Sequence, residues 1–164
     1  MPLAVEWIFE LQGDYEVNLK DFVAVNVSEH HVFEDSKGIV RLELFPGGRA
    51  VVKSGYAWDG CTPKFSVFDI VLGIPDGIPH STTRKPKAYY ASLLHDVLYQ
   101  FLDAGSPISR AEADQVFLGI LARDAFAPRW IYYAAVRLFG GLTRLMARRV
   151  RRYAGRRVIR PHSM

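Results

Sequence analysis

The sequence has very little cysteine and no long apolar run. Its 164 residues contain one cysteine, Cys61, which has no partner for an internal disulfide, and this fits a reducing compartment. The first residues, MPLAVEWIFELQ, have no basic start and carry Glu6 and Glu10, unlike a secretory signal peptide. The run WIYYAAV ends at Arg137, far short of the roughly 18 apolar residues of a membrane-spanning helix. We therefore expect a soluble, cytoplasmic chain without a signal peptide or a transmembrane helix.

Acidic residues are missing from the C-terminal part. Residues 1–127 contain 11 Lys and Arg together with all 17 Asp and Glu, whereas residues 128–164 contain ten arginines and no acid. In LTRLMARRVRRY the apolar positions 142, 145, 146, 150 and 153 fall on one side of a helix and arginines on the other. This pattern is typical of a helix that lies on an anionic membrane surface. Docking on the acidic body is the alternative, and nucleic acid is a weaker one because no binding motif accompanies the arginines.

The first part of the chain has the pattern of β-strands. Short runs rich in Val, Leu, Ile and Phe predict strands over 16–27, 31–35, 38–45 and 49–58. The segment Phe45-Pro46-Gly47-Gly48-Arg49 predicts a hairpin turn between the last two. Residues 55–87 are dense in Gly and Pro and predict a long irregular loop, a kind of segment that is often functional.

From residue 88 the apolar residues recur with helical spacing. The first predicted helix contains AYYASLLHDVLYQFL, and the second begins at Ser109-Arg110-Ala111-Glu112, which has the form of a capping box. A third helix begins after Pro128, is expected to be loosened at Gly140-Gly141, and continues through LTRLMARRVRRY. We predict an α+β fold in which an antiparallel sheet of about four strands is followed by the loop and three helices. A single domain would span 1–153, with a β-rich part over 1–54, the loop over 55–87 and the helical part over 88–153. A basic tail would follow over 154–164, and its order or disorder stays open.

Three polar residues of the helical part, His95, Asp96 and Asp114, form the candidate site. Two helices joined by about six residues are expected to pack antiparallel, which brings His95 of the first opposite Asp114 of the second. A His–Asp hydrogen bond fixes the imidazole tautomer and supports a general base. The same bond is also a common structural tie between helices, since an unpaired buried polar group costs about 1–3 kcal/mol.

Asp96 projects about 100° away from His95 around the same helix and faces a different partner. The candidate partner is the Gly-rich segment GYAWDGC. Asp59, the carbonyl groups around Gly60 and the Asp96 carboxylate would supply the oxygen ligands that Ca²⁺ prefers. Asp59-Gly60 is also an ordinary turn dipeptide, so a plain turn is the alternative.

Four motifs occur in an order that resembles a known family. WDGCTPKF, ASLLHDVLY, SRAEADQVF and WIYYAAVRLFG, spread over about residues 50–140, are similar to an uncharacterised family of phage and prophage proteins, a domain of unknown function. The combination of HDxxY, ADxxF and YAAVRLFG carries this resemblance. It implies a phage or prophage setting, near tail and lysis functions, and no particular activity.

The order of DGC, HDxxY and an Asp on the next helix also resembles, more distantly, the secreted phospholipases A2 of bacteria and fungi. This resemblance implies that His95 is the general base, Asp114 orients it and Tyr99 supports the pair through its hydroxyl. It also implies that Asp96, with Asp59 and the backbone near it, binds calcium. The chain departs from that family in lacking its disulfides and in its β-rich N-terminal part.

Two classes of function follow from these motifs. The first is a calcium-dependent lipid or ester hydrolase whose basic helix docks on an anionic membrane. The second is a non-enzymatic phage tail or assembly component that binds other tail proteins and in which the His–Asp pair is structural. The second class allows a virion-associated location in place of the cytoplasm.

Overall fold

The computed structural model describes residues 9–58, 81, 83, 85, 87–149 and 156–159, and for 139, 141–149 and 156–159 it describes the backbone alone. Its fold is α+β, as the sequence predicts, with antiparallel sheets in the N-terminal part and three helices after them. The loop predicted over 55–87 lies mostly outside the described residues.

Among the described residues, five strands form the larger sheet, and every neighbouring pair in it is antiparallel. In spatial order they are β2 (Tyr15–Asn18), β5 (Arg49–Val52), β4 (Val40–Leu44), β3 (His31–Glu34) and β7 (Arg156–Ile159). A second sheet has two antiparallel strands, β1 (Phe9–Glu10) and β6 (Ala57–Trp58). The segment that forms β7 falls within the predicted basic tail, and it pairs with β3 at the edge of the larger sheet.

The predicted strand over 16–27 is wrong in its length. Strand β2 ends at Asn18, whose side chain accepts a hydrogen bond from the backbone N–H of Lys20 at 3.1 Å. This cap starts a short 3₁₀ helix, η1 (Leu19–Asp21), which turns the fully buried Leu19 into the core. An Asn side chain that satisfies a nearby backbone group competes with strand pairing, and that competition ends the strand.

The predicted hairpin is confirmed. Strands β4 and β5 pair with Leu44 opposite Ala50. The N–H of Phe45 donates to the carbonyl of Arg49 at 2.8 Å, which closes the turn. Gly47 and Gly48 both have positive φ, of 88° and 94°, which explains why two glycines occupy this turn.

The helices are α1 (Tyr89–Gln100), α2 (Arg110–Arg123) and α3 (Arg129–Arg149), with the short η3 (Leu102–Ala104) after α1. The capping box at the start of α2 is confirmed: Ser109 Oγ accepts from the N–H of Glu112 at 3.2 Å, and Glu112 Oε2 accepts from the N–H of Ser109 at 2.7 Å. Helix α3 continues through Gly140 and Gly141, as predicted, and is not interrupted at either glycine. Gly140 is buried against α1, where a Cβ would lie 2.9 Å from the hydroxyl oxygen of Tyr99. The glycine allows close packing there.

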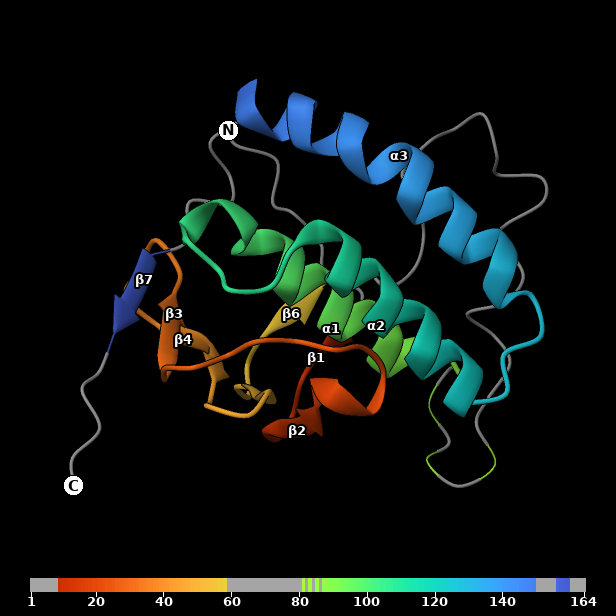
Figure 1. The fold of residues 1–164 in the computed structure, drawn as a ribbon, viewed down its shortest axis with the longest axis horizontal. Helices are drawn as coiled ribbons and strands as arrows, with labels where there is room; N and C mark the ends of the chain where they lie inside the picture. The colour runs from red at the N-terminus through yellow and green to blue at the C-terminus, as the bar shows by residue number, and fades with distance from the viewer. Residues whose placement is uncertain are drawn as a thin grey trace.

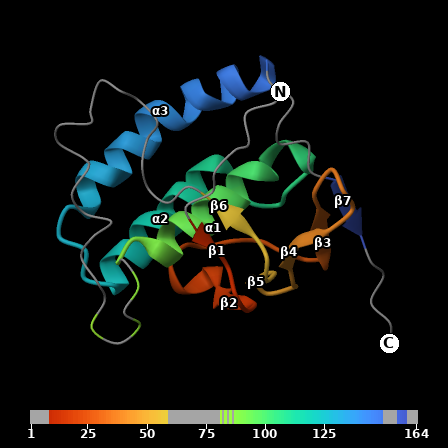
Figure 2. The same cartoon turned by 180° about the vertical axis from the view of Figure 1, so that it is seen from behind.

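The helices stack in layers on the sheets. Helices α1 and α2 run antiparallel, because Lys87, before α1, bonds the carbonyl of Ala125 after α2, while Tyr99 near the end of α1 meets Arg110 at the start of α2. Figure 1 shows α1 and α2 above the strands and α3 across their far side, and Figure 2 shows the same order from behind. Within the described residues, no helix is long and apolar enough to span a membrane.

Apolar side chains from both sheets and from α1 and α2 form the core. The Phe33 ring of β3 packs on Phe101 at 5.2 Å between centroids, and Trp58 of β6 packs on Tyr89 of α1 at 4.8 Å. The indole N–H of Trp58 donates to the Ser92 hydroxyl at 3.0 Å, in a buried position. The first turns of α1 are therefore anchored on the end of β6.

A substitution at Gly119 tests the packing of α2 on the N-terminal part. A Cβ there would lie 2.9 Å from the Cβ of Phe22 and 2.6 Å from its Cδ1, so rotating the Phe22 ring cannot relieve the clash. We expect Gly119→Ala to lower the free energy of unfolding by about 1–3 kcal/mol, despite the higher helix propensity of alanine. Urea denaturation measures the change.

Gly13→Ala is the matched control, because a Cβ at this position would have no heavy atom within 4 Å and the φ of Gly13 is not positive. It should stay within about 0.5 kcal/mol of the parent. A Gly119→Ala chain as stable as the parent would contradict this packing.

Candidate functional site

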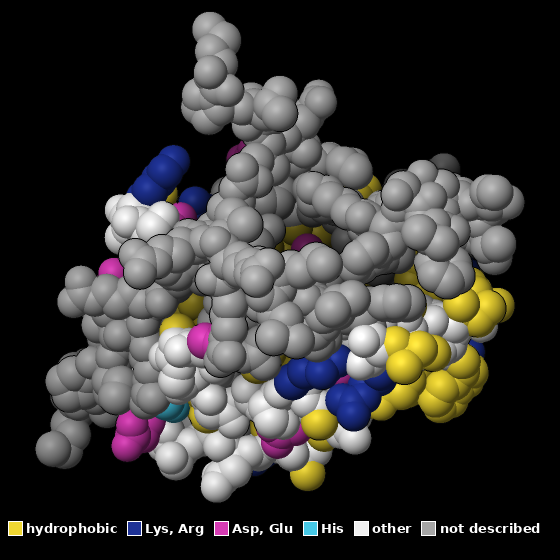
Figure 3. Space-filling view, turned by 90° about the horizontal axis from the view of Figure 1, so that it is seen from above, with side chains coloured by type: hydrophobic (Ala, Val, Ile, Leu, Met, Phe, Trp, Pro, Cys, Tyr) yellow, Lys and Arg dark blue, Asp and Glu magenta, His cyan; other side chains and the backbone are white. Residues whose placement is uncertain are grey.

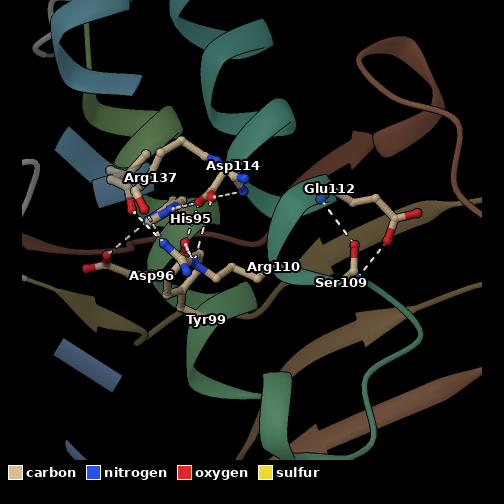
Figure 4. Close-up of polar contacts among 9 residues, drawn as sticks. His95, Asp96, Tyr99, Ser109, Arg110, Glu112, Asp114 and Arg137 are labelled. Carbon is tan, nitrogen blue, oxygen red and sulfur yellow. Dashed lines mark hydrogen bonds and ion pairs between the residues drawn. The ribbon is translucent and has the colours of Figure 1, made fainter. Parts of the chain in front are cut away.

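The carboxylate of Asp114, on the second turn of α2, is the centre of the site. Its side chain has 0% exposed surface. Oδ1 accepts hydrogen bonds from His95 Nε2 at 3.0 Å and from the Tyr99 hydroxyl, and Oδ2 accepts from Arg137 Nη1 at 3.1 Å. Figure 4 shows these three side chains converging on Asp114. Helices α1 and α3 both bond to one buried group of α2.

The sequence pattern of α1 explains how two of the donors reach Asp114. His95 and Tyr99 are four residues apart, so they lie on the same side of the helix, and the antiparallel packing presents both to α2. Their ring centroids are 4.0 Å apart, and the ring of Phe117, one turn after Asp114, lies 5.0 Å from that of His95. The neighbouring residues Leu94 and Leu98 are fully buried in the core and hold α1 in this rotation.

Two arginines complete a cluster that we call the Asp114 network: His95, Tyr99, Arg110, Asp114 and Arg137. Arg110 Nε donates to the Tyr99 hydroxyl at 3.1 Å and lies 3.9 Å from Asp114 Oδ2. Its Nη2 also donates to the backbone carbonyl groups of Val136 and Arg137 on α3. The network therefore links all three helices.

Sequence reasoning missed both arginines. Arg110 stands four residues before Asp114 on the same helix, a spacing that is itself a signal for an ion pair. Arg137 had no local signal, because it lies 23 residues after Asp114 and reaches it only when α3 folds back onto α2.

The surroundings of Asp114, His95 and Tyr99 shift the pKa values of all three side chains. Burial raises the pKa of Asp114, but the hydrogen bonds from His95, Tyr99 and Arg137 outweigh burial and hold that pKa below its ordinary value. Burial lowers the pKa of His95 by more than the bond to Asp114 raises it. Burial and the bond to Asp114 raise the pKa of Tyr99. At neutral pH the network therefore holds an ionised Asp114, a neutral His95 and a protonated Tyr99.

The hydrogen bonds also fix the tautomer of His95. An ionised carboxylate only accepts hydrogen bonds, so the Nε2 atom that faces Asp114 carries the proton. In the neutral ring the lone pair then resides on Nδ1. This atom lies on the side of Asp96, whose Oδ1 is 4.0 Å away.

Asp96 lies at the exposed edge of the Asp114 network, beside the ring of His95. Its side chain is 38% exposed and extends away from Asp114 in Figure 4. The other two residues predicted to bind calcium, Asp59 and Gly60, lie outside the described residues, as does Cys61. Within the part of the chain that the structure describes, no group of three or more His, Cys, Asp or Glu side chains could hold a metal ion.

Replacing the central carboxylate tests its share in stability. In Asp114→Asn the amide cannot accept from all three donors, so Arg137 or His95 loses its partner. We expect the free energy of unfolding to fall by about 3 kcal/mol in urea denaturation. Asp21→Asn, which changes an exposed carboxylate of η1, is the control and should change it by less than about 0.5 kcal/mol. Equal effects of the two variants would contradict a central role for Asp114.

The low pKa of His95 predicts how stability depends on pH. Because the ring gains a proton at a higher pH in the unfolded chain than in the folded one, stability is fully present above the ordinary pKa of 6.5 and falls as pH drops through the folded pKa. Denaturation curves at pH 8, 7, 6 and 5 should show a loss of stability in the parent that is smaller in His95→Gln. Parallel pH profiles of the two chains would be the contrary result.

Comparison with known proteins places this site in a family. A search of curated proteins and a search of solved structures both returned no match. The model of one family matches residues 48–136, more than half of the chain, and this segment contains β5, β6, α1, α2 and the whole Asp114 network except Arg137. The expected membership of an uncharacterised family is thereby confirmed. The chain belongs to the family described as "Protein of unknown function (DUF1353)".

Proposed function

We propose that the chain hydrolyses esters, in the manner of a calcium-dependent phospholipase A2, with His95 as the general base. The observation that carries the proposal is the hydrogen bond between His95 Nε2 and the ionised Asp114, which leaves the lone pair of the ring on Nδ1. The lowered pKa of His95 supports it, because a neutral ring can take up a proton at neutral pH.

The reaction would begin with a water molecule bound near Nδ1. As the water oxygen attacks the ester carbonyl carbon, one of its protons passes to Nδ1 and the carbonyl becomes a tetrahedral oxyanion. Collapse of this intermediate breaks the bond to the alkoxide, which takes the proton back from the imidazolium. An ester and water thus become an acid and an alcohol, and His95 returns to its neutral state.

Asp114 and its other partners act by positioning. Asp114 holds the ring in one tautomer and stabilises the imidazolium that forms during the reaction. The Tyr99 hydroxyl shares Oδ1 with His95, which restrains the orientation of the carboxylate. Arg137 occupies Oδ2 and keeps Asp114 ionised. In this proposal Asp114 and Tyr99 do not touch the substrate.

A calcium ion would fit the chemistry of Asp96, whose carboxylate is a hard oxygen donor with 38% of its side chain exposed. Asp59 and the carbonyl groups around Gly60 would complete its ligands. The residue before Asp59 supports this arrangement. The indole N–H of Trp58 donates a hydrogen bond to Ser92, which stands four residues before Asp96 on α1. The chain therefore passes beside this part of the helix directly before Asp59. When bound, the ion would polarise the ester carbonyl.

A specific observation also favours a second candidate function. The oxygens of Asp114 already accept from three side chains, and His95 has only 8% exposed surface, as expected of a tie between helices. In that case the chain would be a non-enzymatic phage tail or assembly component. The phage or prophage setting itself rests on the motif resemblance and would apply to either function.

One experiment separates the two candidates. The melting temperature is measured with millimolar Ca²⁺ or with EDTA for the parent, His95→Ala and Asp96→Asn, and release of fatty acid is measured on phosphatidylglycerol vesicles. For a hydrolase we expect calcium to raise the melting temperature of the parent but not of Asp96→Asn. Turnover should fall at least about 100-fold in His95→Ala, the usual size of a general-base contribution, and should also be lost in Asp96→Asn, which removes a calcium ligand.

Asp21→Asn is the matched control for charge, because it removes an exposed carboxylate on η1 and should leave both readings unchanged. The hydrolase proposal fails if the parent shows no calcium response and no fatty acid release. Together with a large loss of stability in His95→Ala, that result would support the structural function of the network.

A further inference from the structure

The outer face of α3 exposes large apolar side chains. Trp130 is 61% exposed, Ile131 58% and Leu138 73%, and together they are three of the four exposed large hydrophobic residues among the described side chains. We call them the α3 stripe. They lie opposite the buried Tyr132 and Gly140, which face the rest of the molecule. Figure 3 shows hydrophobic side chains gathered on this face with basic side chains beside them.

The helix that carries the stripe is positively charged. Helix α3 contains five arginines, at positions 129, 137, 144, 148 and 149, and no acidic residue. A helix with exposed Trp, Ile and Leu and with arginines but no acids has the composition of helices that lie in anionic lipid interfaces. There the apolar side chains enter the boundary of the acyl region, and the arginines approach the headgroups.

We propose that the α3 stripe docks on an anionic lipid surface. Charge argues for this occupant over a second copy of the chain, because Asp114 balances only Arg137, and two copies of α3 in contact would bring the other four arginines of each helix together with no acid on either α3. An anionic lipid surface also fits the helix better than a nucleic acid does. The phosphates of a nucleic acid would match the arginines but leave Ile131 and Leu138 in water. A lipid interface satisfies both features of the helix.

The three stripe side chains are separate from the contacts that join α3 to the Asp114 network. Arg137 bonds Asp114 through Nη1, and Arg110 bonds the backbone carbonyl groups of Val136 and Arg137, so this part of α3 is held against α1 and α2. None of the three stripe side chains takes part in these bonds. Docking therefore needs neither catalysis nor calcium, and it holds whether or not the chain is a hydrolase.

Vesicle binding of the full chain in EDTA tests the proposal. The probes are vesicles of phosphatidylglycerol and phosphatidylcholine, compared with phosphatidylcholine alone, in a sedimentation assay. We expect the partition coefficient on anionic vesicles to fall at least about tenfold when Trp130→Ser, Ile131→Ser and Leu138→Ser are combined, and to fall in the parent when salt is raised. Because the assay contains EDTA and measures partition instead of fatty acid release, its outcome is independent of the hydrolase test.

Ile39→Ser is the matched control. Ile39 is the fourth exposed large hydrophobic residue, 46% exposed, and it directly precedes β4 of the larger sheet, so it is not part of α3. This variant should bind vesicles like the parent. The tryptophan emission of the parent should shift to shorter wavelength on binding, and Trp130→Phe should abolish the shift while most binding remains.

Several results would overturn the proposal. They are parent-like binding by the combined variant, equal binding of the parent to neutral vesicles, and an emission shift that persists in Trp130→Phe. Self-association of the parent in sedimentation velocity that the combined variant loses would instead assign the stripe to a second copy. Retention on single-stranded DNA that the combined variant loses would assign it to a nucleic acid.

Discussion

The carboxylate of Asp114 lies inside the helical layer with no exposed surface, and two other helices supply the hydrogen bonds that make its burial tolerable. A buried charge without partners is strongly unfavourable, so α1 and α3 must keep their donors within about 3 Å of it. This requirement sets the relative position of the three helices. Gly140 serves the same end, because its missing side chain leaves room for Tyr99 beneath α3.

The same bonds that stabilise the fold also define the chemistry open to His95. Asp114 fixes the proton on Nε2, and burial keeps the ring neutral. The arginines act in the opposite sense to Asp114. Arg137 bonds the carboxylate, and the positive charge of Arg110 lowers the pKa of His95, so the imidazolium is less stabilised than in an isolated His–Asp pair. The network thus suits a neutral base in a fixed orientation, and it equally suits a rigid tie.

Helix α3 has both buried contacts with the other helices and exposed apolar side chains. Gly140 and the hydrogen bonds at Val136 and Arg137 hold it against α1 and α2, while the α3 stripe is exposed. A helix that needed only to cover the molecule would place polar residues on its outer side. The connection between these contacts and the stripe is direct, since Leu138 follows Arg137 in the chain. A partner that binds the stripe therefore binds the helix whose Arg137 donates a hydrogen bond to Asp114.

Much of the fold and half of the candidate site follow from local patterns in the sequence. The hairpin at 45–49 and the capping box at Ser109 depend on a few neighbouring residues, and both are present. The contact between His95 and Asp114 could be expected as well, because helical periodicity and a short connection set the pairing of α1 and α2. The early end of β2 and the contribution of Arg137 could not. Each depends on groups distant in the chain, or on competition between side chain and backbone, and only the packed structure decides which contact is made.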